Sequence, residues 1–486
     1  MEICDLIKDL DYINIKNMQN FNVSSLSCKS YEENPDGIYF CLSGTKKDGH
    51  DYVKEAETNG AKCLVVERFV DSPLMQILVN NSRVAMTNIS SKFYGVDKSK
   101  MKFVGITGTN GKTTTTFLIK EYLKKLGKSV GLIGTQGIYF NHMMLPANLT
   151  TPDPIELYKT INEMEKNGVE YVVMEASAHA IALHKIDGIN YDVVGLTNIT
   201  RDHLDFFKTM DNYAKAKQKL LSLNHAKKGI INIDDDYSSE IADNVDTDKT
   251  TISLYGDADV CLEDCDFSIK GTKAVIKAEG ETLPVRFNLL GKYNMANLMM
   301  AITVLHNLGF EYEDITNVVN TTKVNVPGRF NVLDTPTDFA VVVDFAHTPD
   351  GVDNVLKTAR ELTQGRIINV FGCGGDRDST KRSVMGEISE NLADYTIVTS
   401  DNPRSENPNL IIKDITENMK RNFETITERK TAIKKALSIA KAGDVVLILG
   451  KGAENYQEIQ GVKYPYSDYS VVDDYFKNKE DNVEII

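Results

Sequence analysis

The sequence lacks the features that mark secreted, membrane-spanning and nucleic-acid-binding proteins. Its 486 residues contain no apolar run long enough to cross a bilayer, and the acidic opening MEICDLIKDL is unlike a signal peptide. The seven cysteines are scattered and odd in number, which excludes a disulfide framework, and Cys261 and Cys265 lack the second Cys or His pair of a zinc site. The net charge of −14 excludes a broad basic surface. We therefore expect a cytoplasmic protein with no membrane insertion and no nucleic-acid partner.

What the sequence contains instead is a long alternation of strands and helices. The length predicts about three domains. Residues 1–98 read as a small α/β unit, with strand-like stretches at 36–44 and 62–67 on either side of a helical stretch at 51–61. A proline–glycine break at 326–330 then divides the rest of the chain into two parts.

Both of those parts contain continuous apolar strands. They occupy 101–108, 129–134, 171–177, 192–199 and 229–234 in the first part, and 339–347, 366–375, 394–403 and 444–452 in the second. Such strands, alternating with helices such as 155–167, are typical of a parallel sheet buried on both faces. The sequence thus predicts an α/β protein with domains 1–98, 99–327 and 328–486. Ligands bind at the carboxyl edge of open α/β sheets, so the two larger domains could share a site.

A glycine loop follows the first strand of the second domain, in GITGTNGKTTTT (105–116). A strand, a glycine loop and a helix in that order present backbone N–H groups and the positive end of the helix dipole to an anion. Lys112 would neutralise phosphate charge, and the Thr113 hydroxyl would bind Mg²⁺. The spacing departs from the standard phosphate loop, because Ile106 stands where the first glycine is expected. A glycine turn without a ligand is the alternative.

Further motifs favour the phosphate loop. GTNGKTT (108–114) resembles the ATP loop of the Mur ligase superfamily, and other segments resemble that family in order along the chain: LTTPDP (149–154), EASAH (175–179), TNITRDHLDFF (197–207), YAKAKQKLL (213–221), GKYNMAN (291–297), VPGRF (326–330), VDFAHTPD (343–350), GCGGDRDSTKR (372–382), DNPR (401–404) and GKGAENYQ (450–457). The most similar branch is the UDP-N-acetylmuramoyl-tripeptide synthetases, which add the third residue of the peptidoglycan stem peptide. The resemblance implies a central P-loop-type parallel-sheet ATPase domain, a C-terminal Rossmann-like α/β domain, small-molecule partners and a monomer.

The resemblance also implies ATP-dependent amide formation through an acyl phosphate, with Mg²⁺ as cofactor. Two anions must meet, so charge neutralisation and positioning dominate the first step. The implied catalytic residues are Lys112, Glu175, His203 and Lys217, and the implied metal ligands are Thr113, Glu175, His203 and Lys217. Lys217 would be carbamylated to N6-carboxylysine, because a carbamate offers oxygens to a cation that an ammonium repels. The residues alone do not separate Lys217 from Lys215 and Lys219, which would share a solvated helix.

For the nucleotide, the resemblance implies two groups of residues. From the second domain come Gly108, Thr109, Asn110, Gly111, Lys112, Thr113, Thr114 and Asn294. Asn294 would also suit the N-cap of a helix that is predicted to begin there. From the third domain come Arg329, Asp344 and His347, which would complete the ATP site when the domains close.

For the incoming amino acid, the resemblance implies meso-diaminopimelate. Family members that add it carry Arg in DNPR, here Arg404, because a guanidinium can grip the second carboxylate in a bidentate manner. Asp401, Asn402 and Pro403 belong to the same turn, and Arg377 adds positive charge. Glu454 and the Gly450 carbonyl would receive the distal ammonium. Without the resemblance, DNPR is simply a turn.

Residues implied for the UDP-muramoyl-peptide depart more from the family pattern. Ser30, Thr150, Thr151, Ser177 and Lys185 are the implied contacts. The segment SLSCKSYEENPDG (25–37) lacks the usual Asp-Ser-Arg triplet, and Lys185 replaces an arginine, whose fork of donors a lysine lacks. Ala178, Ala453, Ser379 and Ser383 also replace residues usual in the family.

Two hypotheses follow from this asymmetry between an intact ATP side and an altered uridine side. The chain could be a diaminopimelate-adding synthetase whose nucleotide-sugar contacts have moved to other residues. Alternatively, it could be a paralogue with the same ATP chemistry but another amino acid, such as L-lysine, or another carboxylate acceptor. A dead regulator that only binds nucleotide is disfavoured, because Lys112, Glu175 and Lys217 are retained.

Overall fold

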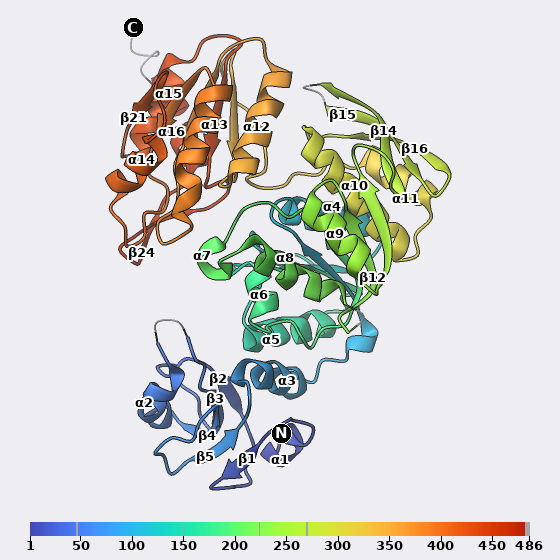
Figure 1. Ribbon diagram of the computed structural model, residues 1–486, viewed down its shortest axis with the longest axis vertical. Helices are drawn as coiled ribbons and strands as arrows, with labels where there is room; N and C mark the ends of the chain where they lie inside the picture. Colours follow the sequence, from blue (N-terminus) through green and yellow to red (C-terminus); the bar gives the residue numbers. More distant parts are fainter. Residues whose placement is uncertain (45–46, 148, 223, 269–270, 482–486) are drawn as a thin grey trace.

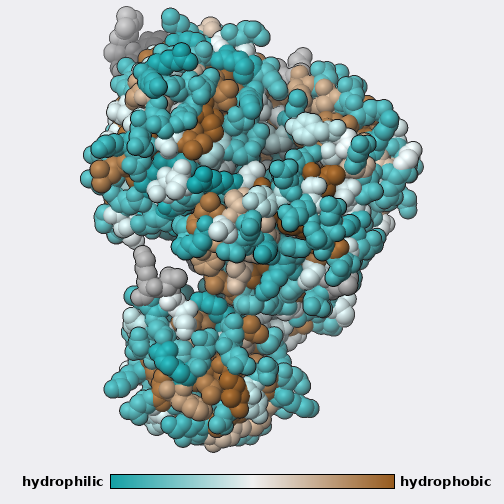
Figure 2. Space-filling view, viewed as in Figure 1, coloured by the Kyte–Doolittle hydropathy of each residue, from teal (hydrophilic) through white to brown (hydrophobic). Residues whose placement is uncertain are grey.

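The computed structural model describes residues 1–44, 47–147, 149–222, 224–268 and 271–481. Three sheets follow one another along the longest axis of the molecule, with the N-terminal unit at one end and the C-terminal unit at the other (Figure 1). In the part of the chain described, no helix has the length and apolar character needed to cross a membrane. The face drawn in Figure 2 is mostly hydrophilic, and its apolar residues are most evident over the N-terminal unit.

The N-terminal unit is a five-stranded sheet with helices. The strands β1 (Asn14–Lys16), β2 (Ser25–Ser27), β3 (Gly37–Phe40), β4 (Ala61–Val66) and β5 (Met75–Leu78) lie in the order β1-β5-β4-β3-β2. The helices are α1 (Ile3–Ile7), α2 (Val53–Thr58) and α3 (Ser82–Tyr94). The strand-like and helical stretches expected at 36–44, 51–61 and 62–67 are confirmed as β3, α2 and β4. Helix α3 also contacts α5 (Pro154–Lys166) of the next unit.

The central sheet has eleven strands in the order β16-β15-β14-β13-β12-β11-β6-β10-β7-β8-β9. Its predicted strands are confirmed as β6 (Lys102–Thr107), β7 (Val130–Gly134), β10 (Tyr171–Glu175), β11 (Tyr191–Leu196) and β12 (Ala226–Asn232). All pairs from β14 to β7 along that order are parallel. The sheet places the carboxyl ends of β6, β10 and β11 side by side.

Both edges of the central sheet are antiparallel, which the sequence analysis did not predict. One edge is β8 (Gly137–Phe140) with β9 (Met143–Leu145). The other comprises β14 (Val260–Ser268), β15 (Gly271–Ala278) and β16 (Glu281–Phe287), which follow β13 (Asp248–Ser253). Apolar residues alternate with polar ones in β15 and β16, as suits strands with one covered face.

Helices cover both faces of the central sheet. Apolar residues of α4 (Lys112–Lys125), α10 (Lys292–Asn307) and α11 (Tyr312–Thr321) form one core with the strands. Residues of α5, α6 (Ala178–Ala182), α8 (Met210–Gln218) and α9 (Asp236–Asn244) belong to the core on the opposite face. The short α7 (Leu204–Phe207) adds Phe207 to that second core.

The C-terminal unit is a six-stranded sheet in the order β17-β18-β22-β19-β20-β21. The predicted strands are confirmed as β18 (Ala340–Asp344), β19 (Ile367–Phe371), β20 (Tyr395–Val398) and β22 (Val445–Leu449), and β21 (Phe423–Thr425) extends the parallel set. Only β17 (Asn331–Leu333) pairs antiparallel within it. Helices α12 (Pro349–Leu362), α13 (Arg382–Leu392) and α14 (Pro408–Thr416) cover one face, and α15 (Arg429–Ile439) and α16 (Asp468–Asp481) the other. A separate hairpin joins β23 (Tyr456–Ile459) to β24 (Val462–Pro465).

Candidate active site

The glycine loop between β6 and α4 has a backbone that glycine alone adopts easily. Gly108 has φ +143°, and a Cβ there would lie 1.8 Å from Thr197 Oγ1. Gly111, which precedes the first residue of α4, has φ +87°, and a Cβ there would lie 2.3 Å from Asn297 Oδ1. Both residues therefore need to be glycine. The loop is held close to β11 and α10, and α4 begins directly after it with its positive dipole end at Lys112.

Lys112 lies at the centre of the site. Its Nζ donates hydrogen bonds to the carbonyls of Gly108 and Thr109, each at 2.8 Å. Burial lowers the pKa of Lys112, and the carboxylates of Glu175 and Asp202 act in the opposite direction. A cation that bonds only to carbonyls of its own loop can turn toward a phosphate without breaking an ion pair.

Thr113, Glu175 and Arg329 meet beside Lys112. The Thr113 hydroxyl lies 3.1 Å from each carboxylate oxygen of Glu175, which closes strand β10. The Glu175 carboxylate also accepts the Thr135 N–H at 2.9 Å. From the C-terminal unit, Arg329 Nη2 donates to Thr113 Oγ1 at 3.0 Å. The strand end thus gathers two hard oxygen donors, which are the ligand type that Mg²⁺ prefers.

Lys217, on α8, differs from the nearby Lys215 and Lys219 in its burial. Its side chain is 1% exposed, whereas Lys215 and Lys219 are exposed. Its Nζ donates to the Gly108 carbonyl at 2.7 Å and lies 4.5 Å from the centre of the Tyr213 ring. Burial holds the pKa of Lys217 well below its ordinary value, and the charge of Lys112 lowers it further. The fold therefore favours a neutral amine at this position.

His203 lies beyond β11 on the loop before α7. Its φ of +56° is in the left-handed region, and its Nε2 is 3.3 Å from Asp202 Oδ2. Burial lowers the pKa of His203, while Asp202 opposes that shift, and the charge of Lys112 adds to it. The imidazole is thus neutral, as metal binding requires, and it lies within electrostatic reach of both lysines.

The four predicted Mg²⁺ ligands fit a metal site in part, because two of them are in direct contact. Thr113 and Glu175 touch each other, whereas His203 and Lys217 form no hydrogen bond or ion pair with either of them among the described residues. Within the described residues, no three side chains of His, Cys, Asp and Glu gather as a metal site. The four predicted ligands include a threonine and a lysine, and a carbamate on Lys217 would supply the further anionic oxygens.

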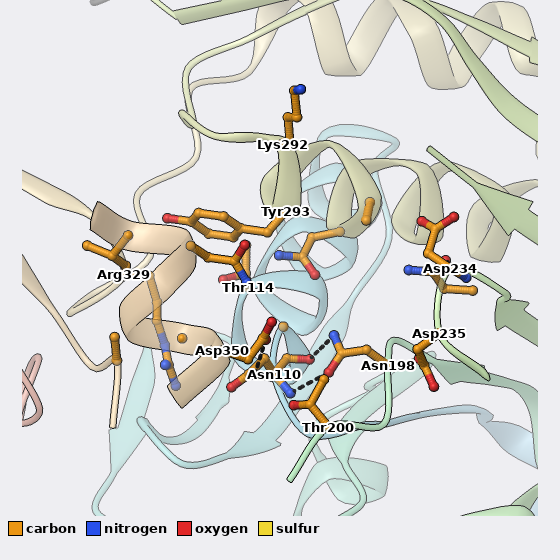
Figure 3. A pocket seen from close by; sticks show the side chains of 18 of the residues that line it. Asn110, Thr114, Asn198, Thr200, Asp234, Asp235, Lys292, Tyr293, Arg329 and Asp350 are labelled. Carbon is orange, nitrogen blue, oxygen red and sulfur yellow. Dashed lines mark hydrogen bonds between the residues drawn. The ribbon is translucent and has the colours of Figure 1, made fainter. Parts of the chain in front are cut away.

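A pocket of about 260 Å³ extends from the phosphate loop between the central and C-terminal units. Asn110, Gly111 and Thr114 line it on one side, and Arg329, Asp344, His347 and Asp350 line it on the other. Figure 3 shows Asn110 and Asp350 facing each other across it, and Asn110 Nδ2 donates to Asp350 Oδ2 at 2.8 Å. The two larger units therefore share this cavity, as the sequence analysis expected for their strand edges.

Asn294 lies behind the wall of that pocket. Helix α10 begins at Lys292 after Gly291, so the N-cap interpretation of Asn294 is wrong. Asn294 Nδ2 donates to the Leu290 carbonyl at 2.7 Å, and its Oδ1 accepts Asn297 Nδ2 at 3.1 Å. The second asparagine of the same motif, Asn297, is the one that lines the pocket.

The C-terminal unit brings Arg329, Asp344 and His347 to the pocket. The Arg329 guanidinium lies 4.6 Å from the Phe345 ring centre, and its buried Nε has no hydrogen-bond partner in the described part of the chain. Asp344 accepts the N–H groups of Phe330 and Ala346, each at 2.6 Å. Burial raises the pKa of Asp344, and the charge of Arg329 opposes that effect. A guanidinium with an unused buried donor suits an anionic ligand.

Three of the residues predicted for the muramoyl peptide gather beside Glu175. Thr151 Oγ1 donates to the Glu175 carbonyl at 2.8 Å and lies 3.2 Å from Ser177 Oγ. Thr150 is joined to the same strand end through the Thr135 hydroxyl at 3.0 Å. These hydroxyls form a polar wall next to the predicted metal ligand.

The other two predicted contacts lie farther out. Lys185 pairs with Asp153 at 2.8 Å, and Ser30 donates to Glu55 Oε2 at 2.5 Å within the N-terminal unit. Burial raises the pKa of the Cys28 thiol in that unit to about 11, and the charge of Asp153 adds to the shift. In the described part of the chain, the hydrogen bonds of Ser30 go to Glu55 and Asn59 of its own unit.

The predicted amino-acid residues surround one turn of the C-terminal unit. Arg404 has φ +50°, and its Nη1 donates to the Gly375 carbonyl at 2.7 Å. Arg377 lies within electrostatic reach of Arg404, and burial together with that like charge lowers its pKa. Pro403 packs against the segment GCGG (372–375), where a Cβ on Gly375 would lie 2.0 Å from the Pro403 carbonyl oxygen. Arg404 Nε also lies 3.2 Å from Glu458 Oε2, so one of these two cations already pairs with a carboxylate.

Asp401 and Glu454 are the predicted acidic residues around the same turn. Asp401 Oδ1 accepts the Asn402 N–H at 2.6 Å, and its buried Oδ2 lacks a hydrogen-bond partner among the described residues. A Cβ on Gly450 would lie 2.6 Å from that oxygen, so glycine is needed there. Glu454 accepts Asn402 Nδ2 at 2.9 Å. The turn therefore has both cationic and anionic groups around it, which are the kinds of partner that a zwitterionic ligand needs.

Comparison with known proteins extends over nearly the whole chain. The family model of the Mur ligase middle domain matches residues 106–305, and that of the Mur ligase glutamate ligase domain matches 328–452. A Clostridium acetobutylicum protein named UDP-N-acetylmuramoyl-L-alanyl-D-glutamate–2,6-diaminopimelate ligase 1 is 40% identical, over 98% of this chain and 99% of its own. An Aquifex aeolicus protein named as such a ligase is 41% identical, over 93% of each chain.

The chain belongs to the Mur ligase family.

Solved structures agree with this assignment. A structure of a UDP-N-acetylmuramoyl-L-alanyl-D-glutamate–2,6-diaminopimelate ligase superposes with a TM-score of 0.66 and 30% identity, covering 94% of this chain and 95% of that one. A MurF ligase from Thermotoga maritima in complex with ADP shares the fold, with a TM-score of 0.65 and 21% identity over 95% and 98% of the two chains.

Sequence reasoning missed several polar residues of this Mur ligase. Asp202 and Lys381, both buried, form an ion pair of 3.4 Å between the central and C-terminal units. Arg201 Nη2 donates to Thr380 Oγ1 at 2.6 Å beside that pair. Each lies within a motif noted in the sequence, but an ion pair between residues 179 positions apart leaves no local signal.

Proposed function

We propose that this Mur ligase uses ATP and Mg²⁺ to join meso-diaminopimelate to UDP-N-acetylmuramoyl-L-alanyl-D-glutamate in the cytoplasm, as a step of peptidoglycan precursor synthesis. The observation that carries the proposal is the contact between the His203 loop and the Arg377 loop, through Asp202–Lys381 and Arg201–Thr380. It joins the phosphate-transfer residues to the amino-acid turn. The names of the relatives support the choice of substrates.

In the first step, the substrate carboxylate attacks the γ-phosphorus of ATP, an acyl phosphate forms, and ADP leaves. Two anions approach one another, so the chain must supply positive charge. Lys112 would turn from its loop carbonyls to the β- and γ-phosphates, and Arg329 would approach them from the C-terminal unit. Thr113, Glu175, His203 and a carbamylated Lys217 would hold Mg²⁺, which neutralises phosphate charge when bound.

In the second step, the amine of the amino acid attacks the acyl carbon. The C–N bond forms, the bond from carbon to the phosphate oxygen breaks, inorganic phosphate leaves, and the amine releases its proton. The Asp202–Lys381 contact would keep the amino-acid site of the C-terminal unit against the phosphate-transfer residues of the central unit during this attack. Positioning of this kind supplies a large part of the acceleration in two-substrate reactions.

Carbamylation of Lys217 follows from its environment. A neutral amine forms an N–C bond with CO₂ and loses one proton, and burial with a lowered pKa keeps this amine neutral. The exposed Lys215 and Lys219 lack that environment. We propose Lys217 as the modified residue for this reason.

Recognition of diaminopimelate would use the cationic and anionic groups around the DNPR turn. Arg404, aided by Arg377, would bind the distal carboxylate, and Glu454 with the Gly450 carbonyl would receive the distal ammonium. L-Lysine has the ammonium without the carboxylate, so the Arg404 guanidinium would gain no partner beyond Glu458, which lies 3.2 Å from its Nε. Loss of a hydrogen-bonded charge pair in a desolvated site discriminates strongly.

The uridine substrate would bind from the N-terminal side. Thr150, Thr151 and Ser177 would contact the peptide beside Glu175, and Lys185 with Ser30 would lie toward the nucleotide sugar. The predicted domains 1–98, 99–327 and 328–486 would then contribute mainly to the uridine substrate, to ATP and to the amino acid, respectively.

The test measures phosphate release with ATP, Mg²⁺ and UDP-N-acetylmuramoyl-L-alanyl-D-glutamate. Meso-diaminopimelate, L-lysine and no amine are compared. We expect turnover with diaminopimelate only. Turnover with L-lysine, or with neither amino acid, would contradict the proposal and favour a paralogue with another amino acid or acceptor.

Arg404→Ala sharpens this test. We expect the KM for diaminopimelate to rise at least about 30-fold while the KM for ATP stays within about twofold. Arg421→Ala, which removes an exposed arginine of the same unit, is the matched control. A loss of ATP binding in Arg404→Ala would show that the residue is structural.

A further inference from the structure

The loop after β22 contains a buried lysine that the proposed mechanism does not use. Lys451 has no exposed surface. Its Nζ lies 2.7 Å from Glu454 Oε2 and 2.9 Å from Asn402 Oδ1. Both partners are residues predicted to bind the amino acid, so this cation lies directly behind that site.

The three side chains form a closed triangle. Asn402 Nδ2 donates to the same Glu454 oxygen, at 2.9 Å, that accepts from Lys451. Asn402 Oδ1 accepts from Lys451 and also from the Glu458 N–H at 3.0 Å. Because two donors face Oδ1 and a carboxylate faces Nδ2, the amide of Asn402 has one orientation only. The Glu454 carboxylate is likewise held at one oxygen.

We propose that Lys451 is a positioning residue that sets the selectivity of the amino-acid site. The inference rests on the proposed function. Lys451 holds Oε2 of Glu454, so that Oε1 is left to face the distal ammonium of the amino acid. It also fixes the Asn402 amide on the DNPR turn, two residues from Arg404.

The charge of Lys451 bears on which amino acid is accepted. An unpaired carboxylate at residue 454 would attract any primary ammonium, including the side chain of L-lysine. With Lys451 beside it, the Lys451–Glu454 pair has no net charge, and Glu454 offers a directed hydrogen bond rather than a free anion. The site then depends on the carboxylate that Arg404 binds, which diaminopimelate has and L-lysine lacks.

Two lysines near the Tyr456 ring provide a test variant and its control. The Tyr456 ring centre lies 5.5 Å from Lys451 Nζ. A methionine has a similar length and no charge, so Lys451→Met removes the ammonium while filling most of its space. The same ring also contacts Lys463, whose Nζ lies 4.3 Å from its centre on the exposed β24 strand. Lys463→Met therefore provides a matched control.

The experiment measures kcat and KM for meso-diaminopimelate and for L-lysine in the wild type, Lys451→Met, Lys463→Met, Glu454→Gln and the double variant Lys451→Met/Glu454→Gln. For Lys451→Met we expect the KM for diaminopimelate to rise about tenfold and the ratio of kcat/KM for diaminopimelate over L-lysine to fall at least about tenfold. The KM for ATP should stay within about twofold. Lys463→Met should match the wild type.

The double variant separates positioning from a general loss of structure. If Lys451 acts through Glu454, then Lys451→Met should change the selectivity ratio less than about twofold when Glu454→Gln is already present. Equal effects in the two backgrounds, or an unchanged ratio in Lys451→Met, would overturn the inference. A parallel rise in the KM for ATP would do so as well, because it would show a structural role. A wild type that prefers L-lysine would contradict both the proposed function and the direction of selectivity assigned to Lys451. If the effects of the two substitutions simply add in the double variant, only the role of Lys451 is contradicted.

Discussion

The phosphate loop and the N-terminal segment 25–37 are both predicted to contact a nucleotide, yet they are built differently. In the loop, Gly108 and Gly111 are confined by β11 and α10, and Arg329 reaches Thr113 from another unit. In the segment, Ser30 bonds to Glu55 of its own unit, and Tyr31 is exposed. The loop is therefore fixed by several units at once, and the segment by one.

This difference explains why the family pattern is intact on one side and altered on the other. A residue of the loop has neighbours that cannot move, so a change there leaves charge or space uncompensated. A surface contact to a sugar or a base can pass to another side chain or to water. The comparison predicts large effects at the loop and small effects at the segment.

Lys112→Met should produce the largest effect. The β- and γ-phosphates would lose their one lysine partner in the loop, so we expect kcat/KM for ATP to fall about 10³-fold or more. Phosphate release in the complete reaction measures this. Lys124→Met, an exposed lysine near the other end of α4, should match the wild type. If kcat/KM for ATP fell less than about tenfold, the phosphates would not bind beside Lys112, and the contrast between the loop and the segment would fail.

Lys217→Met should have the next largest effect. Without the carbamate, we expect kcat to fall about 10²- to 10³-fold. In ¹³C NMR with labelled bicarbonate, the wild type and Lys215→Met should show one carbamate signal that Lys217→Met lacks. Lower pH protonates the amine and should weaken the signal. A signal retained in Lys217→Met would assign the modification to another residue.

Ser30→Ala tests the other side of the comparison. Its hydroxyl is already bonded within its own unit, so we expect the KM for the UDP-muramoyl-dipeptide to rise only about two- to fivefold, with the KM for ATP unchanged. Ser24→Ala, which removes a hydroxyl bonded to the Pro35 carbonyl, is the control. A rise above about 100-fold would mean that the segment is as constrained as the loop.

The sequence predicted the parts of this fold that local patterns encode. Buried parallel strands such as 171–177 are continuous apolar runs, and each was found close to its expected bounds. The strands of residues 248–287 were not predicted, since alternation of polar and apolar residues interrupted by turns is a weaker pattern. The helix that contains Asn294 begins two residues earlier than expected, because Gly291 rather than a polar side chain precedes it.

The candidate site was only partly accessible to such reasoning. Motifs located Thr113 and Glu175, but their 3.1 Å contact depends on the pairing of β6 with β10. Three lysines of one helix look alike in sequence, and burial alone distinguishes Lys217. The Lys451 triangle depends on Asn402, 49 positions away. Long-range polar contacts are decided by the fold and have no local pattern.

The smallest expected effect concerns stability and His347, which lies between the two larger units. Burial lowers the pKa of His347 below 6.5, the nearby Lys381 adds to this shift, and Asp202 opposes it. The native state therefore binds fewer protons than the unfolded state as pH falls below 6.5, and stability is lost in that direction. Since two-fifths of the His347 side chain is exposed, solvent screens part of the effect.

His347→Gln should reduce the fall in Tm between pH 6.5 and 5 by about 1–2 °C, whereas His142→Gln, at the exposed turn after β8, should not change it. A steeper fall in His347→Gln would mean that Asp202 outweighs burial and holds the imidazole charged, which would make this contact between the units an ion pair like that of Lys381.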